Sequence, residues 1–213
     1  MNTNKIKEYK KSLKLSSIQR EIIIGLILGD GHLETQNNGK TYRLKIEQSI
    51  KSIEYIDWLY DNFREWVLTE PKEKIKKDIR FKKDVINVYF NTVSHSAFRF
   101  YANQFYNGKK KIVPKLIYRW LTPLSIASWF MDDGSIKSFK HKGKIINTQG
   151  FTKIEVKYLS DCLLRKYGIK SKLRRQKNNT WQLYLLSETI DKFYKIINPY
   201  IISSMRYKLI NLG

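Results

Sequence analysis

The amino-acid sequence predicts an α+β protein made of two halves that repeat one order of helices and strands. Two apolar runs, at residues 23–31 and 126–134, have the composition of buried helices, and both end in Asp-Gly. After each run come strand patterns, an amphipathic helix, further strand patterns and a closing helix. An internal repeat of about a hundred residues predicts pseudo-twofold symmetry, with the two Asp-ended helices on the axis.

The two Asp-ended helices are expected to pack against each other. A helix that is apolar nearly all round must be buried, and Gly25 and Gly29, four residues apart, let two helix backbones approach closely. This pairing makes neighbours of Asp30 and Asp133, which stand at the ends of the two runs. Because like charges brought together are usually held by a divalent cation, the paired helices predict a metal site.

The first half is expected to span residues 1–108. Its buried helix begins at a capping box made by Ser16 and Gln19. The strand that follows alternates apolar residues with a largely basic face, as a half-buried strand does. The elements expected after the first helix are a strand at 41–49, a helix capped by Ser52 and ended by Pro71, strands at 79–82 and 85–90 around a charged turn at 82–84, and a helix at 94–106.

A Lys-rich connector at 109–118 is expected to lead into the second half, residues 119–213. Thr122 is suited to cap the second buried helix, with Pro123 in its first turn. Thr152 and Glu155 form another capping box. The other elements expected are a strand at 144–149, a helix that ends at Gly168, strands at 169–175 and 180–186 around a turn at 178–179, and a last helix capped by Ser187 and stopped by Pro199.

The charge of the chain points to a polyanionic partner. The net charge is +22 and the pI is about 9.9, and a surface that repels itself this strongly favours a nucleic acid. The 41 Lys and Arg are interleaved with 14 Tyr and 10 Phe, which favours a folded nucleic-acid binder over a disordered basic arm. A generic basic protein is the alternative.

Other classes are disfavoured by what the sequence lacks. One cysteine, Cys162, excludes an internal disulfide and a multi-cysteine zinc site. The three histidines lack metal-ligand spacing, and the absence of a Walker-type loop disfavours ATP-driven chemistry. No stretch is apolar enough to span a membrane, and no signal or transit peptide is recognisable. The abundance of Lys, Ile, Asn and Tyr indicates an AT-rich genome, which is compatible with an organelle-encoded gene.

The two apolar runs resemble the paired signature helices of LAGLIDADG homing endonucleases, in the single-chain form with two motifs. Asp30 and Asp133 stand at the last acidic position of that signature, and a glycine follows each. Leu28, Ser128 and Met131 depart from the signature, but none of them removes the last acid. The segments similar to corresponding parts of one family member encoded in an rRNA intron are 39–42, 121–123, 147–149 and 199–200, so the resemblance covers nearly the whole chain.

The resemblance implies two antiparallel sheets that form a DNA-binding saddle. It also implies a monomeric, site-specific endonuclease that breaks both strands of double-stranded DNA at a long asymmetric target and promotes intron homing. The cofactor it implies is Mg²⁺, with Mn²⁺ as a substitute. Together with the AT-rich composition, it predicts an organelle-encoded protein of a mitochondrial or other organelle matrix.

The residues themselves suit this chemistry. Phosphodiester hydrolysis needs a nucleophilic water and stabilised charge on the phosphate and the leaving oxygen, which two metals about 3.5–4 Å apart supply. Asp30 and Asp133 are the expected catalytic and metal-binding acids, and the backbone carbonyls of Gly29 and Asp132 are expected to complete the metal shell. For either acid alone a plain helix-end role is the alternative, which the matched pair disfavours.

The resemblance further implies one catalytic lysine in each half. Lys111 matches the first and Lys208 the second, with Lys110 as an adjacent alternative. For any lysine here, a solvated or phosphate-contacting charge is the other interpretation. Candidates for holding a metal-bound water are Glu47, Gln48 and Gln149.

Sequence specificity is expected to come from the outer faces of the strands. In the major groove Arg and Lys pair with guanine, and Asn and Gln with adenine, whereas phosphate contacts position the protein without specifying a sequence. The sequence does not separate these two groups. The residues expected to contact DNA are Arg43, Lys45, Arg80, Lys82, Lys172, Arg174 and Gln182.

Two rival classes share the same scaffold. A non-catalytic intron RNA maturase explains the charge, the aromatic residues and the fold equally well, and so does a DNA-binding regulator. Neither explains why both terminal acids are present, each with a matching lysine.

Overall fold

The computed structural model describes residues 3–78, 83–136 and 141–209. The chain forms two compact units: unit 1 comprises residues 1–20 and 31–102, and unit 2 comprises residues 21–30 and 103–213. The first apolar run therefore folds almost entirely within the same unit as the second run. Across the described part of the chain, no helix has both the length and the apolar character needed to cross a membrane.

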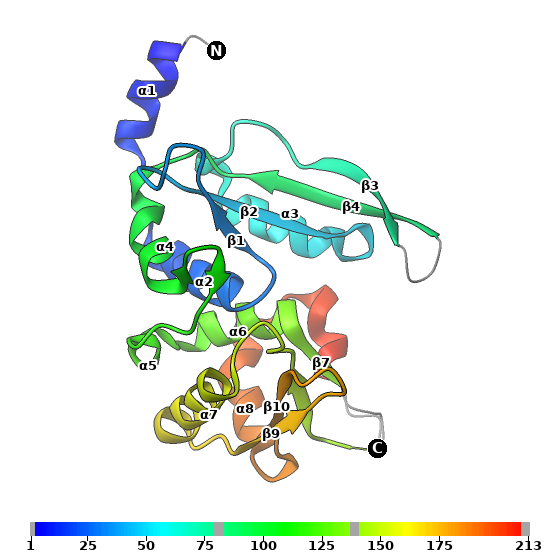
Figure 1. Ribbon diagram of the computed structural model, residues 1–213. Helices are drawn as coiled ribbons and strands as arrows, with labels where there is room; N and C mark the ends of the chain where they lie inside the picture. The colour runs from blue at the N-terminus through cyan, green and yellow to red at the C-terminus, as the bar shows by residue number, and fades with distance from the viewer. Residues whose placement is uncertain (1–2, 79–82, 137–140, 210–213) are drawn as a thin grey trace. The chain divides into compact units, whose positions relative to one another are not determined.

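Unit 1 contains a four-stranded antiparallel sheet with the strand order β1-β2-β4-β3. The strands are β1 (His32–Glu34), β2 (Arg43–Ser49), β3 (Lys72–Asp78) and β4 (Lys83–Asn91). The helices are α1 (Thr3–Ser12), α3 (Ile53–Asn62), and the parts within this unit of α2 (Ser17–Leu28) and α4 (Arg99–Phe105). Figure 1 shows α3 lying along one face of the sheet.

The core of unit 1 lies between α3 and strands β2 and β4. Leu44 and Ile46 are buried and alternate with polar residues along β2, which confirms the predicted half-buried strand. Tyr60 of α3 packs edge to face against Phe90 of β4, with ring centroids 5.6 Å apart. The sheet therefore buries one face under α3 and leaves the polar face of β2 on its other side.

The hairpin of the first half differs from the prediction. The structure has a strand β3 at 72–78 that the sequence did not predict, and Lys83 and Asp84 belong to β4 rather than to a turn. The strand predicted at 79–82 lies outside the described residues. Strand β3 pairs with β4 along its whole length, from Lys72 opposite Tyr89 to Asp78 opposite Lys83. Strand β3 was not predicted because the sequence KEKIKKD carries no apolar alternation, so its strand conformation depends on the partner strand.

The predicted helix between Ser52 and Pro71 is shorter than expected and starts differently. Ser49, rather than Ser52, accepts a capping hydrogen bond, and the helix α3 ends at Asn62. A short 3-10 turn at Arg64–Trp66 follows it, and Phe63 and Trp66 are buried. Burial of these two large side chains competes with continuation of the helix.

Unit 2 contains a second four-stranded antiparallel sheet, with the order β7-β8-β10-β9, and a short hairpin of β5 and β6. The strands are β5 (Tyr106–Asn107), β6 (Lys110–Lys111), β7 (Gly134–Ile136), β8 (Lys144–Ile146), β9 (Ser171–Arg175) and β10 (Trp181–Leu185). The helices are α5 (Ile117–Trp120), α6 (Pro123–Asp133), α7 (Lys153–Tyr167) and α8 (Ile190–Ile197). Helix α7 packs against β9 and β10, and α8 against α6 (Figure 1).

Local signals placed most helices correctly. The capping boxes predicted at Ser16 and at Thr152 are present, and Thr122 caps α6 with Ser125 as its reciprocal partner. Gly168 ends α7 in the left-handed conformation, with φ 64°. The last helix differs: Ser187 opens a short 3-10 turn, and α8 itself begins at Ile190.

The two halves repeat one topology. The first runs α2, β1, β2, α3, β3, β4, α4, and the second runs α6, β7, β8, α7, β9, β10, α8. Both sheets place their four strands in the same relative order. The predicted αββαββα repeat with two antiparallel sheets is therefore confirmed.

The predicted pairing of the two apolar helices is also present, within unit 2. A Cβ added at Gly25 would lie only 2.4 Å from the Ser125 carbonyl oxygen and 2.6 Å from the Ser128 Cβ. The Thr122 hydroxyl of α6 donates a hydrogen bond to the Glu21 carboxylate of α2. Glycine on α2 and small serines on α6 therefore allow the two backbones to touch.

Candidate active site and nucleic-acid interface

The three acids of the apolar runs meet where α2 and α6 end. Asp30 follows α2 directly after Gly29, and Asp132 and Asp133 are the last two residues of α6. The Asp132 carboxylate accepts a hydrogen bond of 3.1 Å from the Asp30 N–H. A Cβ added at Gly29 would lie 2.6 Å from the Asp132 Cβ, so a glycine at this position makes room for that contact.

Each helix end also holds a lysine on the carbonyl just before its final acid. Lys111 Nζ donates to the Gly29 carbonyl at 2.6 Å. Lys208 Nζ donates to the Asp132 carbonyl at 3.3 Å and also to the Met131 carbonyl. Since Gly29 precedes Asp30 and Asp132 precedes Asp133, the two lysines occupy equivalent places at the two helix ends.

Burial and like charges shape the electrostatics of this cluster. Burial, followed by the charges of Asp30 and Asp132, raises the pKa of Asp133 to about 8, against the opposing effect of the two lysines. Burial lowers the pKa of Lys111 and of Lys208, and the three acids oppose that effect. An added cation would offset these effects and stabilise the charged form of Asp133.

The donor set of the cluster suits a hard cation. Carboxylate and backbone carbonyl oxygens are the ligands that Mg²⁺ prefers, and Mg²⁺ usually takes only one or two carboxylates together with waters and substrate phosphate oxygens. Within residues 3–78, 83–136 and 141–209, no group of three or more His, Cys, Asp or Glu is arranged to hold a metal by itself. The carboxylate and carbonyl oxygens at the two helix ends are donors of the kind that a divalent cation takes.

In unit 2, the residues predicted to contact DNA share one face of the sheet. Gln182 of β10 lies opposite Arg174 of β9, and Tyr184 lies opposite Lys172. Lys172 and Arg174 are exposed, whereas the alternate residues of β10 are buried in the core. The β9–β10 hairpin therefore presents a basic outer face with an amide in its middle.

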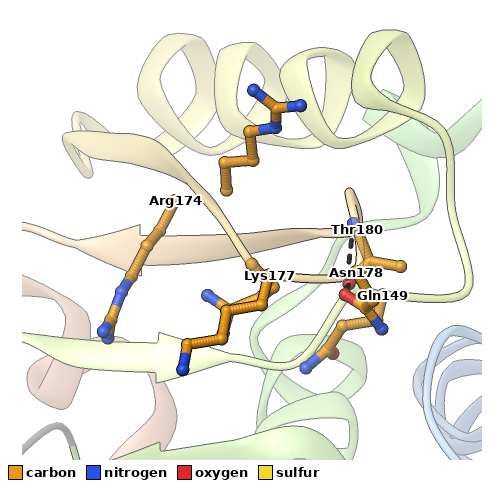
Figure 2. Close-up of a pocket in the computed structure, with 7 residues that line it drawn as sticks. Gln149, Arg174, Lys177, Asn178 and Thr180 are labelled. Atoms are coloured by element: carbon orange, nitrogen blue, oxygen red, sulfur yellow. Dashed lines mark hydrogen bonds between the residues drawn. The ribbon is translucent and has the colours of Figure 1, made fainter.

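A pocket of about 490 Å³ lies beside the turn of this hairpin (Figure 2). In Figure 2, Arg174 and Lys177 extend to the same side of the hairpin. The turn is held by bonds from the Thr180 N–H and hydroxyl to Asn178 Oδ1, and from the Arg175 guanidinium to Asn179. The pocket is lined by Gln149, Arg174, Arg175, Gln176, Lys177, Asn178 and Thr180.

The corresponding face of unit 1 carries ion pairs between neighbouring strands. Arg43 pairs with Glu34 of β1, and Glu47 pairs with Lys76 of β3, which the prediction had not included. Lys45 lies between them along β2, opposite Asn91 of β4. Two of the predicted DNA contacts, Arg80 and Lys82, lie outside the described residues.

The residues predicted to hold a metal-bound water already have partners within the protein. Glu47 is occupied by Lys76 and also accepts a bond from Asn87 at 2.8 Å. Gln149 donates to Asn147 Oδ1 at 3.4 Å. The lysine alternative Lys110 is exposed in β6, while its neighbour Lys111 reaches the Gly29 carbonyl.

Asn147 is the residue at this site that the sequence prediction missed. Its backbone N–H and its side-chain Nδ2 each donate to the Asp133 carbonyl at 3.0 Å. The expected strand at 144–149 ends at Ile146 instead, and Asn147 is the residue that directly follows it, beside the Gly134–Ile146 pair. Gln149 was predicted instead of Asn147 because the strand was expected to continue to residue 149.

Comparison with known proteins identifies the class. The model of the LAGLIDADG DNA endonuclease family matches residues 20–193. The chain belongs to this family of DNA endonucleases, as its paired Asp-ended helices predicted.

Individual relatives sharpen this assignment. A probable intron-encoded endonuclease of Wickerhamomyces canadensis is 36% identical over 215 residues, covering 98% of this chain and 91% of the relative. The solved structure of the homing endonuclease I-WcaI bound to its DNA recognition sequence matches with a TM-score of 0.91 and 34% identity, over 98% of this chain and 93% of that one. The cytochrome b mRNA maturase bI2 of Saccharomyces cerevisiae is 34% identical over 89% of this chain, which spans 47% of the maturase.

Proposed function

We propose that this protein is a site-specific homing endonuclease that cuts both strands of DNA by metal-dependent hydrolysis and so promotes intron homing. The observation that carries the proposal is the matched arrangement at the two helix ends, each with a final acid and a lysine on the preceding carbonyl. Two equivalent sets of groups suit a reaction on two strands. Membership of the endonuclease family supports the same reaction.

In this proposal Asp30 and Asp133 are the catalytic acids and the main metal ligands. The carbonyls of Gly29 and Asp132 lie beside them and offer further oxygen donors. A bound Mg²⁺, or Mn²⁺ in its place, would supply a Lewis acid for the reacting phosphate. The oxygen donors fit such a cation, and the raised pKa of Asp133 reflects a cluster that gains from one.

Lys111 and Lys208 are proposed as the catalytic lysines. Each ammonium is fixed on a carbonyl next to an acid, so it is already oriented before substrate arrives. A preorganised cation of this kind can orient the attacking water by a hydrogen bond and can stabilise the negative charge that develops on the phosphate. The three neighbouring acids favour the charged form of both lysines, although burial opposes it.

The proposed substrate is double-stranded DNA with a long asymmetric target site, bound by a monomer. I-WcaI is a homing endonuclease with a DNA recognition sequence, and its similarity supports DNA as the partner. The two sheet faces carry different residues, with Arg43 and Lys45 on β2 and with Lys172, Arg174 and Gln182 on β9 and β10. Different side chains on the two faces would read different bases, which favours an asymmetric target.

The boundaries and origin of the protein are also proposals. We infer a first half at 1–108, a connector at 109–118 and a second half at 119–213, because the topology repeats across that connector. We infer an organelle-encoded gene and a mitochondrial or other organelle matrix. The abundance of Lys, Ile, Asn and Tyr, which indicates an AT-rich genome, supports this origin, and so does similarity to a cytochrome b mRNA maturase.

A cleavage assay tests the proposal. Wild type and Asp133→Asn are incubated with a library of intron-insertion-site duplexes in Mg²⁺ or in Ca²⁺. Double-strand cleavage by wild type in Mg²⁺ that is lost in Asp133→Asn is the expected result. Tight binding to DNA or to intron RNA without cleavage in either metal would contradict the endonuclease.

A maturase is the second candidate function, favoured by the identity to the bI2 maturase along most of this chain. It is compatible with the same fold and with the net charge of +22. Binding and splicing assays with the intron RNA that surrounds the gene separate the two. Splicing activity that survives in Asp133→Asn would show a maturase function that does not use the proposed endonuclease site.

A further inference from the structure

The Asp133 carbonyl at the end of α6 accepts two hydrogen bonds from one residue, Asn147. The last carbonyls of a helix lack partners within the helix, but the Asp133 carbonyl accepts two hydrogen bonds of 3.0 Å, from the N–H and from Nδ2 of Asn147. A carbonyl oxygen has two lone pairs, so both are used by one residue. Asn147 therefore fixes the peptide plane that follows Asp133, and with it the direction in which the Asp133 side chain leaves the backbone.

The other end of the same amide faces the basic surface of the sheet. Asn147 Oδ1 accepts a bond of 2.7 Å from Gln182 Nε2 and a longer one of 3.4 Å from Gln149 Nε2. Gln182 stands in the middle of β10 opposite Arg174, and Gln149 lines the pocket of Figure 2. One side chain thus touches both the proposed catalytic acid and the proposed DNA-binding face.

These partners define the orientation of the Asn147 amide. With Oδ1 toward two donors and Nδ2 toward a carbonyl, every contact joins a donor to an acceptor. The flipped amide would place Nδ2 against the Gln182 NH₂ group and Oδ1 against the Asp133 carbonyl, and both contacts would be repulsive. The Asp133 carbonyl, which can only accept, therefore determines the orientation of the Asn147 amide, and Asn147 Oδ1 in turn orients the Gln182 amide.

We propose that Asn147 is a positioning residue for Asp133, and that Gln182 couples this positioning to the DNA on the sheet face. The inference rests on the proposed endonuclease function. Gln182 Nε2 has two N–H donors, of which one holds Asn147. The other N–H, together with Oε1, is the pair that reads adenine N7 and N6 in the major groove. An adenine at this position leaves the Asn147 bond in place, whereas a base that pulls the Gln182 amide out of its plane releases Asn147 and the end of α6.

The coupling acts on one of the two acids. Asn147 bonds the Asp133 carbonyl, whereas the Asp30 N–H is held by the Asp132 carboxylate. Loss of Asn147 is therefore expected to slow cleavage of one strand more than the other. Displacement of a reacting group by about 1 Å can lower a rate about 100-fold, so the nicked intermediate should accumulate.

The test uses a duplex that wild type cuts, with each strand labelled in turn, under single-turnover conditions in Mg²⁺. The variants are Asn147→Ala and Gln182→Leu. Thr148→Val is the matched control, because it removes the adjacent bond from Thr148 Oγ1 to the Trp181 carbonyl without touching Asp133. Binding affinity in Ca²⁺ and the thermal midpoint are measured for every variant.

Asn147→Ala is expected to slow one strand about 100-fold and to leave the other strand and the Ca²⁺ affinity within about threefold. Gln182→Leu should bias the same strand, and the double variant should be no slower than the worse single variant, because both act through one contact. Thr148→Val should lower the thermal midpoint while both strands keep their wild-type ratio.

Equal slowing of both strands by Asn147→Ala, or a strand bias that Thr148→Val reproduces, would overturn the positioning role while leaving the endonuclease intact. Wild-type protein that cuts no duplex in Mg²⁺ would instead overturn the proposed function, and this inference with it. The two failures are therefore distinguishable.

Discussion

Helix α2 ends in Gly29 and Asp30, whereas helix α6 ends in Asp132 and Asp133. Both ends hold a lysine on the carbonyl before the final acid, so they share one arrangement of backbone and cation. They differ in the residue that carries that carbonyl. At the α2 end this residue has no side chain, and at the α6 end it adds a third carboxylate.

The difference makes the two ends interdependent. The Asp132 carboxylate bonds the Asp30 N–H across the helix pair, and it fits there because a Cβ at Gly29 would collide with it. The same carboxylate is one of the charges that raise the pKa of Asp133. The two halves therefore share one topology but differ in the acidic residues at their helix ends.

Substitution of either lysine is expected to have the largest effect on cleavage at the two helix ends. Lys111→Met and Lys208→Met are each expected to slow cleavage by about 10²–10³-fold, the scale of losing one preorganised group that stabilises transition-state charge. Since each lysine serves one helix end, the two variants should slow cleavage of opposite strands of a labelled duplex. The measurement is the single-turnover rate of each strand in Mg²⁺.

Lys110→Met is the matched control for this pair, because Lys110 is an exposed neighbour of Lys111 on the same short strand. Its strand rates should stay within about threefold of wild type. A loss of activity in Lys110→Met that equals the loss in Lys111→Met would refute the assignment of the first lysine.

Gly25→Ala tests whether the two ends depend on close packing of α2 against α6. The new Cβ would lie 2.4 Å from the Ser125 carbonyl oxygen and 2.8 Å from the Trp129 nitrogen, both of which are backbone atoms. Overpacking of this kind lowers the free energy of unfolding by about 1–3 kcal/mol or more. Both strand rates should fall together, because the variant disturbs the helix pair that carries both acids. The measurement is urea unfolding with strand-resolved cleavage.

Gly150→Ala is the control for that substitution. Among the described residues, no heavy atom lies within 4 Å of a Cβ built there. The change is therefore expected to alter stability by less than about 1 kcal/mol, and in the stabilising direction if at all. Equal unfolding curves for the two variants would mean that close approach at Gly25 is not required.

The parts of the fold that the sequence predicted correctly depend on local signals. Ser16 with Gln19, and Thr152 with Glu155, specify helix starts within four residues. Strand β3 was not predicted because its charged sequence acquires strand conformation only by pairing with β4. The end of α3 was missed for a similar reason, since it depends on the burial of Trp66. Non-local packing decides both cases.

The residues of the candidate site also divide into those that a sequence pattern reveals and those that depend on non-local contacts. Asp30 and Asp133 could be found because each ends an apolar run, and the two lysines because they match a family pattern at positions far apart in sequence. Asn147 gave no comparable signal, because its importance depends on where β8 stops and on which carbonyl it then meets. The ion pairs that occupy Arg43 and Glu47 were equally invisible, since their partners lie on neighbouring strands.

The two sheet faces offer a milder contrast than the helix ends. Arg174→Met removes a cation beside the pocket of Figure 2, and it should reduce the slope of log affinity against log salt by about 0.9, the value for one phosphate contact. Glu34→Gln should make that slope steeper and binding tighter, because it frees Arg43 from its ion pair. The measurement is DNA affinity in Ca²⁺ over a range of salt concentrations. Unchanged slopes in both variants would contradict a phosphate-contacting role for these faces.

Glu155 separates the stability of unit 2 from the chemistry at the helix ends. Burial alone raises the pKa of Glu155, but hydrogen bonds from Thr152 and from the Val113 N–H lower it more, so the net pKa lies below its ordinary 4.5. A lowered pKa in the folded state adds stability above the unfolded pKa, and that stability is lost as the pH falls through the folded value. Glu155→Gln is therefore expected to be less stable than wild type by about 1 kcal/mol or less at pH 7, with the difference shrinking below about pH 4.5. Urea unfolding at pH 7 and pH 4 measures this difference in stability.

Cleavage by the same variant is the control. Because Glu155 caps α7 rather than α2 or α6, both strand rates should remain equal to wild type at pH 7. A strand bias in this variant would mean that general loosening of unit 2, rather than the groups at the helix ends, distinguishes the two sites.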